Sequence, residues 1–373
     1  MPFIPTRLFN GLCIALAVGL FAYANACGLG QTYDSTIYLQ AGAFWAGQSA
    51  LLPGFERPPL QGWLLALGAW LGMERWAYGV NLLALVVSVV FFGRCAELVV
   101  QPLRLRQALL LAWAVATPLH LVHRFIWSEP VFLAFWMLHT WLLLRWVGQP
   151  KRSDWGGLLL CAMAMNLQRT AGIFWVVGTA SVLFWRSREV SLAQRWGEAL
   201  GYAAGALLPW AVWTAWGWQV GSANLHTMAG EAWQQSWAEK QNIRVYFDEL
   251  SRWFLPALVA FRWRVAVFCI ALAMGLRWAA RQPWSTPQRL HLTSLLVPLL
   301  AYLLLMQGIT QVPFEEAQRY LALAYPAVLL LLGAMLSPYF AHKWVYWAIG
   351  LWITYGLLRT LQNIYFWHTV GCF

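Results

Sequence analysis

The sequence predicts an all-α protein that crosses a membrane many times. Of its 373 residues, 61% are hydrophobic and only 10% are charged, which would leave a soluble protein without enough polar surface to cover its core. Apolar segments long enough to cross about 30 Å of hydrocarbon recur along the chain, and the stretches between them hold nearly all the charge. We therefore expect one integral membrane domain over residues 1–373, with about eleven transmembrane helices.

The N-terminal segment predicts a first span that leads from the cytoplasm to the outer side. Residues 8–26 are apolar and follow Arg7, and arginine and lysine collect on the cytoplasmic side of membranes. The letters "ANAC" at residues 24–27 also have the small-residue pattern of a signal-peptidase site, so cleavage of this segment stays open. In either case, the chain from Gly28 onward begins outside.

Residues 58–72 predict a helix on the outer surface and not a span. This run is short for 30 Å of hydrocarbon at about 1.5 Å per residue, and its two prolines suit the first turn of a helix. If it crossed, Arg94, Arg104 and Arg106 would lie outside, against the positive-inside rule. The first outer loop, residues 27–77, is therefore expected to hold juxtamembrane helices.

The ten remaining spans follow by parity from this topology, with arginine and lysine marking the cytoplasmic ends. The largest outer loop is then residues 217–264. The predicted spans are residues 78–92, 107–122, 130–144, 155–167, 171–185, 197–216, 265–276, 292–307, 321–336 and 344–358.

The charge balance and the side-chain inventory fit a protein whose main partner is the lipid bilayer. We interpret the net charge of +11 as positive-inside bias, and therefore expect no nucleic-acid partner. The 27 tryptophans suit the headgroup layer. The six cysteines show no metal-ligand spacing, and a disulfide between Cys27 and Cys372, both outside, is left open. The cofactor is unknown, because no metal motif is evident but a divalent cation remains open.

Functional groups are expected on the outer side. None of the fourteen carboxylates lies at the centre of a predicted span, whereas ion-coupled transporters keep ionisable groups near the midplane of the bilayer. This pattern favours chemistry at the outer surface. The polar outer stretches are residues 27–78, 120–129, 217–264 and 308–320.

Two stretches of the first outer loop carry reactive side chains. Asp34, in "QTYDSTIYLQAG", precedes an amphipathic helical pattern and is either a helix N-cap or a general base, and spacing alone favours the cap. Arg57, between Glu56 and the prolines of "ERPPLQGW", is a fixed cation suited to a lipid phosphate. Its other interpretation is an interfacial arginine that snorkels to the headgroups.

Together with three later motifs, these stretches resemble the GT-C superfamily of polyprenyl-phosphate-sugar glycosyltransferases. The resemblance is to bacterial relatives of protein O-mannosyltransferases and to the lipid A aminoarabinose transferase, and it covers most of the chain in patches. It rests on the order of the motifs and on their shared outer location. The later motifs are "SEPVFLAFWML", "NLQRTAGIFWVVG" and "QRYLALAYPAVLLLLG".

The resemblance implies a GT-C-like fold and an enzyme that moves a hexosyl or pentosyl group from a polyprenyl-phosphate carrier to an acceptor hydroxyl. The acceptor would be a glycolipid, a glycan or a protein on the periplasmic face of the bacterial inner membrane, with the N-terminus in the cytoplasm. Two other functions stay open. One is a flippase or transporter of lipid-linked sugars, and the other is an outer-face polysaccharide ligase that draws on His226, Arg244 and Arg252.

The resemblance also implies roles for individual residues, in which carboxylates take the acceptor proton and arginines stabilise the departing phosphate. It places Asp34 and Glu129 at catalytic positions, and at Asp34 it reverses the preference for a cap. Ser35 stands where relatives have a second acid, which leaves metal dependence in doubt. The residues expected to bind substrate are Glu56, Arg57, Arg169, Arg319 and Tyr320.

Two of these assignments have simpler alternatives in the sequence. Glu129, in "SEP", is also suited to the first turn of a helix, where the macrodipole favours an acid by about 0.3–1 kcal/mol. Arg169 sits at a short turn between two predicted spans and is equally well interpreted as a snorkelling arginine.

Overall fold

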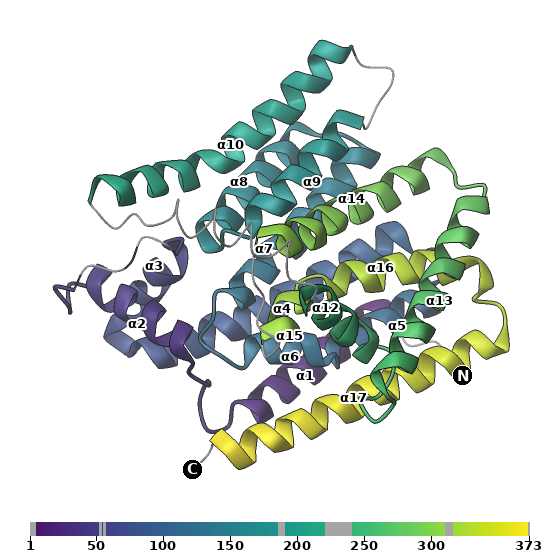
Figure 1. The fold of residues 1–373 in the computed structure, drawn as a ribbon, viewed down its shortest axis with the longest axis horizontal. Helices are drawn as coiled ribbons and strands as arrows, with labels where there is room; N and C mark the ends of the chain where they lie inside the picture. The colour runs from purple at the N-terminus through teal and green to yellow at the C-terminus, as the bar shows by residue number, and fades with distance from the viewer. Residues whose placement is uncertain are drawn as a thin grey trace.

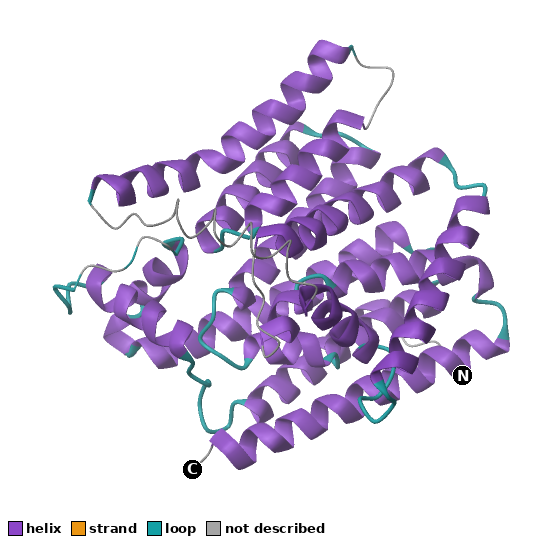
Figure 2. Cartoon of the chain, in the orientation of Figure 1, coloured by secondary structure: helices purple, strands orange, loops and turns teal. Residues whose placement is uncertain are grey.

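The computed structural model describes residues 5–51, 54, 57–185, 191–220, 241–309 and 316–371, and the statements below concern these residues. Sixteen α-helices and two 3₁₀ helices make up this part of the chain, in which no strand is found (Figure 2). The prediction of an all-α chain is therefore confirmed.

The first outer loop of the prediction contains short helices. α2 and α3 pack on each other at one end of the bundle, on the left in Figure 1. With eight residues, α3 is about 12 Å long and cannot cross about 30 Å of hydrocarbon, in agreement with the prediction for residues 58–72. The elements of this region are α1 (Thr6–Ala24), α2 (Tyr33–Trp45), α3 (Leu60–Leu67), η1 (Ala69–Leu71) and α4 (Met73–Val99).

The rest of the chain forms a bundle in which α10 and α17 lie along opposite edges and α4, α7 and α14 lie between them (Figure 1). A helix is found at every predicted span. These elements are α5 (Leu103–Ala114), α6 (Thr117–His123), α7 (Glu129–Gly148), α8 (Arg152–Gln168), α9 (Gly172–Trp185), α10 (Leu192–Gln219), α12 (Gln241–Arg252), α13 (Phe261–Arg281), α14 (Thr286–Ile309), α15 (Ala317–Ala322), α16 (Tyr325–Leu336), η3 (Ser337–Tyr339) and α17 (Lys343–Gly371).

Two segments predicted as continuous spans are broken helices. Residues 107–122 are divided between α5 and α6, which bend by 40°, and residues 321–336 are divided between α15 and α16. A proline explains each break, because its ring clashes with the carbonyl four residues earlier and it lacks an N–H. Pro118 lies four residues after Ala114, where α5 ends, and Pro326 lies four residues after Ala322, where α15 ends.

Helix length and apolarity identify fewer spans than the sequence predicts. Among the described residues, four helices are long and apolar enough to cross a membrane by themselves, namely α1, α4, α7 and most of α14. The bent pair of α5 and α6 makes a fifth if it counts as one span. The number of eleven spans therefore stays a prediction.

Several tryptophans lie in the protein interior and not at the headgroup layer. Trp113, Trp136 and Trp175 are fully buried in the main hydrophobic core, to which α4, α5, α7, α14 and α16 contribute.

Near the end of the bundle that holds α2, the His368 ring of α17 contacts the Tyr23 carbonyl of α1 at 2.6 Å. Cys27 is disulfide-bonded, and Cys372 lies outside the described residues.

Single cysteines at Trp70 and Arg104, in a Cys269→Ser background, test the predicted topology. Both positions are exposed, whereas Gln61 in α3 is only 1% exposed and is unsuitable for labelling. We expect a membrane-impermeant maleimide added outside to label Trp70→Cys, and to label Arg104→Cys only after the membrane is opened. Labelling of Arg104→Cys from outside would overturn the topology.

Candidate active site

Asp34 lies in the first turn of α2 but does not cap it. The N-cap is Thr32, whose backbone N–H donates to the Ser35 hydroxyl oxygen at 3.0 Å in a capping box. Asp34 is the second residue of the helix, so its carboxylate is available to other parts of the chain. The N-cap interpretation of Asp34 is therefore wrong. Ser35, which stands where relatives have a second acid, takes part in the capping box of α2.

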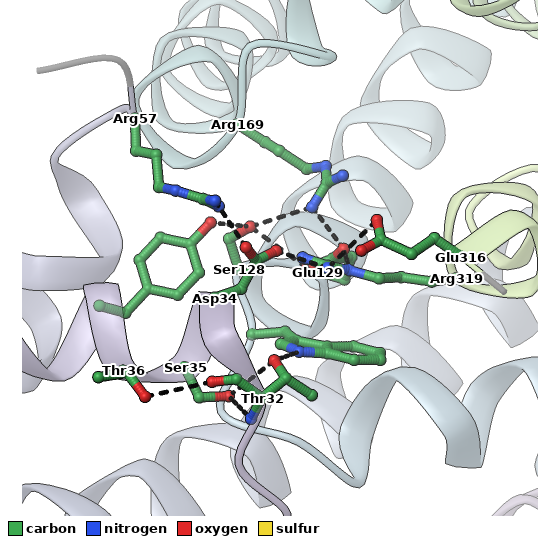
Figure 3. Close-up of polar contacts among 12 residues, drawn as sticks. Thr32, Asp34, Ser35, Thr36, Arg57, Ser128, Glu129, Arg169, Glu316 and Arg319 are labelled. Atoms are coloured by element: carbon green, nitrogen blue, oxygen red, sulfur yellow. Dashed lines mark hydrogen bonds and ion pairs between the residues drawn. The ribbon is translucent and has the colours of Figure 1, made fainter. Parts of the chain in front are cut away.

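The Asp34 carboxylate is shared between two arginines from distant segments. Its Oδ1 accepts a hydrogen bond from Arg57 Nη2 at 2.6 Å, and its Oδ2 lies 2.6 Å from Arg319 Nη1 in α15 (Figure 3). The side chain is 15% exposed, so both pairs are partly shielded from solvent. Neither interpretation of Arg57 from sequence included this ion pair.

Glu129 continues this chain of ion pairs into the interior. It is the first residue of α7, is completely buried and pairs with both Arg169 and Arg319. Its Oε2 also accepts from Arg319 Nη2 at 3.2 Å. We call these five side chains the arginine network: Asp34, Arg57, Glu129, Arg169 and Arg319.

Neighbouring hydroxyl and aromatic groups hold the arginine network in place. The Ser128 hydroxyl accepts hydrogen bonds from Tyr38 at 3.0 Å and from Arg169 at 3.2 Å, and lies 3.3 Å from Glu129 Oε2, to which it donates. The Arg319 guanidinium lies over the Trp127 ring, 4.3 Å from its centroid. Trp127 in turn donates its indole N–H to Thr32 at 2.8 Å, which ties the network to the start of α2.

The arginines keep Asp34 ionised. Burial alone would raise the pKa of this carboxyl, but Arg319 and Arg57 outweigh burial and lower the pKa below its ordinary value. The reverse holds for Arg319, where burial opposes the charge but Glu129 and Asp34 raise the pKa of the guanidinium. Three guanidinium groups face the two carboxylates of the network, and a third carboxylate, that of Glu316, lies 3.8 Å from Arg319 Nη1, so these six side chains together carry no excess charge.

The structure brings together most of the residues that the sequence singled out. Asp34, Glu129, Arg57, Arg169 and Arg319 form the network, and the Tyr320 ring lies 4.9 Å from the Arg169 guanidinium. Glu56 and His226 lie outside the described residues.

The two arginines considered for a ligase are not members of the arginine network. Arg252 pairs with Asp248 at 2.7 Å within α12, and the Arg244 guanidinium lies over the Phe261 ring at 5.2 Å.

Sequence reasoning missed Tyr38, Trp127 and Ser128 as members of the site. Ser128 and Tyr38 fall within the quoted motifs. Nothing in the sequence indicates a functional role for them, and only the fold shows that the Ser128 hydroxyl bonds both Tyr38 and Arg169.

A pocket of about 260 Å³ opens beside Asp34. Glu129 is not among its lining residues, so Asp34 is the network carboxylate that a substrate there would meet. The described residues contain no group of three or more histidine, cysteine, aspartate or glutamate side chains that could hold a metal ion. The lining residues are Thr32, Tyr33, Asp34, Leu121, Trp127, Glu316, Gln318 and Arg319.

Comparison with known proteins identifies the fold. No protein-family model and no curated protein matches the chain. Among solved structures, it is similar to the crystal structure of ArnT from Cupriavidus metallidurans bound to undecaprenyl phosphate, with a TM-score of 0.59 and 15% sequence identity. The match covers 89% of this chain and 60% of the ArnT chain, so the chain spans less than two thirds of the length of ArnT.

Replacing Arg319 tests whether the network stabilises the fold. Arg319→Gln leaves the buried Glu129 with one partner fewer, and breaking a buried ion pair costs about 3–5 kcal/mol. Arg94→Gln is the matched control, because Arg94 pairs with Glu97 at the surface, where such pairs contribute at most about 1 kcal/mol. Thermal unfolding in detergent should show a larger loss for Arg319→Gln. Equal losses would mean that the network is not a structural element.

Proposed function

Because the chain has the GT-C fold of ArnT, we propose that it is a membrane glycosyltransferase that uses a polyprenyl-phosphate sugar donor. The observation that carries the proposal is Asp34, an ionised carboxylate held by Arg57 and Arg319 at the edge of a pocket. ArnT is bound to undecaprenyl phosphate, and we extend the same class of carrier to this chain. The sugar goes to an acceptor hydroxyl on the periplasmic face of the inner membrane.

The arginine network supplies a site for the donor phosphate. Arginine presents a planar fork of donors that suits phosphate oxygens, and Arg57 and Arg169 approach the network from the α3 and α8 sides (Figure 3). The Arg169 Nε is buried and has no hydrogen-bond partner among the described residues. The departing phosphate gains negative charge, which preorganised guanidinium groups stabilise.

Asp34 is the group best placed to act as general base. In the proposed transfer, the bond between the anomeric carbon and the phosphate oxygen breaks, and its electron pair goes to the phosphate. The acceptor oxygen bonds to the anomeric carbon, and its proton moves to the Asp34 carboxylate. Glu129 suits this role less well, because it is fully buried between Arg169 and Arg319 and does not line the pocket.

The Asp34→Asn variant tests the proposed base. Asparagine keeps the shape of the side chain but cannot take a proton, so single-turnover transfer from a synthetic polyprenyl-phosphate sugar should fall by about two to four orders of magnitude. Glu74→Gln, an exposed acid at the start of α4, is the matched control, and thermal unfolding checks that both variants fold. A near-normal rate in Asp34→Asn would move the base to another carboxylate.

Donor binding tests the two proposed phosphate ligands. Arg57→Ala and Arg169→Ala each remove a charged hydrogen-bond donor, so binding of undecaprenyl phosphate should weaken by about 1.5–3 kcal/mol. Arg75→Ala, an exposed arginine of α4, controls for the loss of charge near the membrane surface. Unchanged affinity in both test variants would leave Arg57 and Arg169 as snorkelling arginines.

A further inference from the structure

The pocket beside Asp34 differs in charge from the phosphate side of the arginine network. Its lining contains two carboxylates, Asp34 and Glu316, and one guanidinium, that of Arg319. The remaining polar groups, from Thr32, Tyr33 and Gln318, are neutral. The charged side chains of the lining therefore sum to one negative charge.

The positive charge of Arg319 is already engaged by carboxylates. Its guanidinium contacts Asp34 at 2.6 Å and pairs with the buried Glu129 on the other side. Arg57 and Arg169 do not line the pocket, and Figure 3 shows Thr32 away from both of them, whereas Glu316 lies on the side of Arg169. An anion in the pocket would be repelled by two carboxylates, and the only guanidinium group among the described residues of the lining already forms ion pairs with carboxylates.

Glu316 gives the pocket a second acceptor of hydrogen bonds. Its side chain is 42% exposed, and its Oε2 lies 3.8 Å from Arg319 Nη1, too far for a hydrogen bond. An ionised carboxylate accepts hydrogen bonds from hydroxyl groups, and two such groups at one pocket suit a ligand that presents two or more hydroxyls. The Tyr33 ring, 80% exposed, adds an aromatic surface of the kind that lines ligand pockets.

We propose that this pocket is the acceptor site and that it takes a neutral sugar ring. One hydroxyl of the ring faces Asp34 and another is bound by Glu316, while phosphorylated acceptors are disfavoured by the two carboxylates. This proposal rests on the proposed function, because it takes Asp34 as the base. It assigns the donor phosphate to Arg57 and Arg169 and the acceptor to the pocket lining, and it makes Glu316 a specificity-determining residue.

The charge of the pocket is measured with thiol reagents. Tyr33→Cys, in a Cys269→Ser background, places a reactive thiol on the lining, and Cys269 is the exposed free cysteine among the described residues. We expect a cationic methanethiosulfonate to react faster than an anionic one, after both rates are divided by those for 2-mercaptoethanol. Glu316→Gln should lower this ratio by about threefold or more, as expected for one charge in a partly solvated site.

A distant acid provides the control for the thiol experiment. Glu97→Gln, which removes a carboxylate at the far end of α4, should leave the ratio unchanged. A ratio that favours the anionic reagent, or that does not respond to Glu316→Gln, would overturn the proposal.

Binding of sugars tests the ligand class itself. Saturation-transfer NMR on the wild-type protein should detect at least one member of a panel of neutral methyl hexosides and should give a weaker signal for glucose 6-phosphate. The hexoside signal should decrease in Glu316→Gln and persist in Glu97→Gln. Equal signals for the two classes of sugar, or none from any neutral hexoside, would overturn the proposal. Neither experiment requires turnover, so these failures are distinguishable from failure of the proposed function, which the donor-binding and Asp34→Asn measurements report.

Discussion

The ion pairs of Arg319 with Asp34 and Glu129 are the interaction on which the site depends. Asp34 belongs to α2, Glu129 begins α7 and Arg319 belongs to α15, so one guanidinium joins three segments that are far apart in the sequence. Removal of Glu129 from water carries a large desolvation cost, which only close pairing with cations offsets. Arg169 and Arg57 extend this pairing to the end of α8 and to the chain before α3.

The shared arginines also set the electrostatics of the proposed reaction. As long as Arg57 and Arg319 hold Asp34, its pKa stays low and it is a weak base. A donor phosphate bound by Arg57 would compete with Asp34 for that guanidinium group. Binding of the donor would therefore weaken one of the two ion pairs of the carboxylate and strengthen it as a base at the moment when an acceptor proton must be taken. In this account, the ion pairs of Asp34 seen in the structure are those of the protein before the donor binds.

The sequence predicted the helical fold and most members of the network, but not how they pair. Apolar runs located the helices, and the length of residues 58–72 correctly indicated a helix too short to span. Hydropathy masked the breaks at Pro118 and Pro326, and the proline rule alone would not have placed them, because Pro209 and Pro298 lie inside the continuous helices α10 and α14. The N-cap at Thr32 was missed because aspartate is generally preferred over threonine at N-cap positions. In the structure, the Asp34 side chain instead points toward the arginines with which it forms ion pairs. Glu316 carries no motif, and only the pocket reveals it.

The affinity of undecaprenyl phosphate for wild type and for Asp34→Asn tests the central claim most directly. If Asp34 and the donor phosphate compete for Arg57, removal of the carboxylate frees this guanidinium group for the phosphate. The account then predicts a dissociation constant that is several-fold lower for Asp34→Asn at low ionic strength, with the difference shrinking as salt is added. Weaker binding by Asp34→Asn than by the wild-type protein would contradict it.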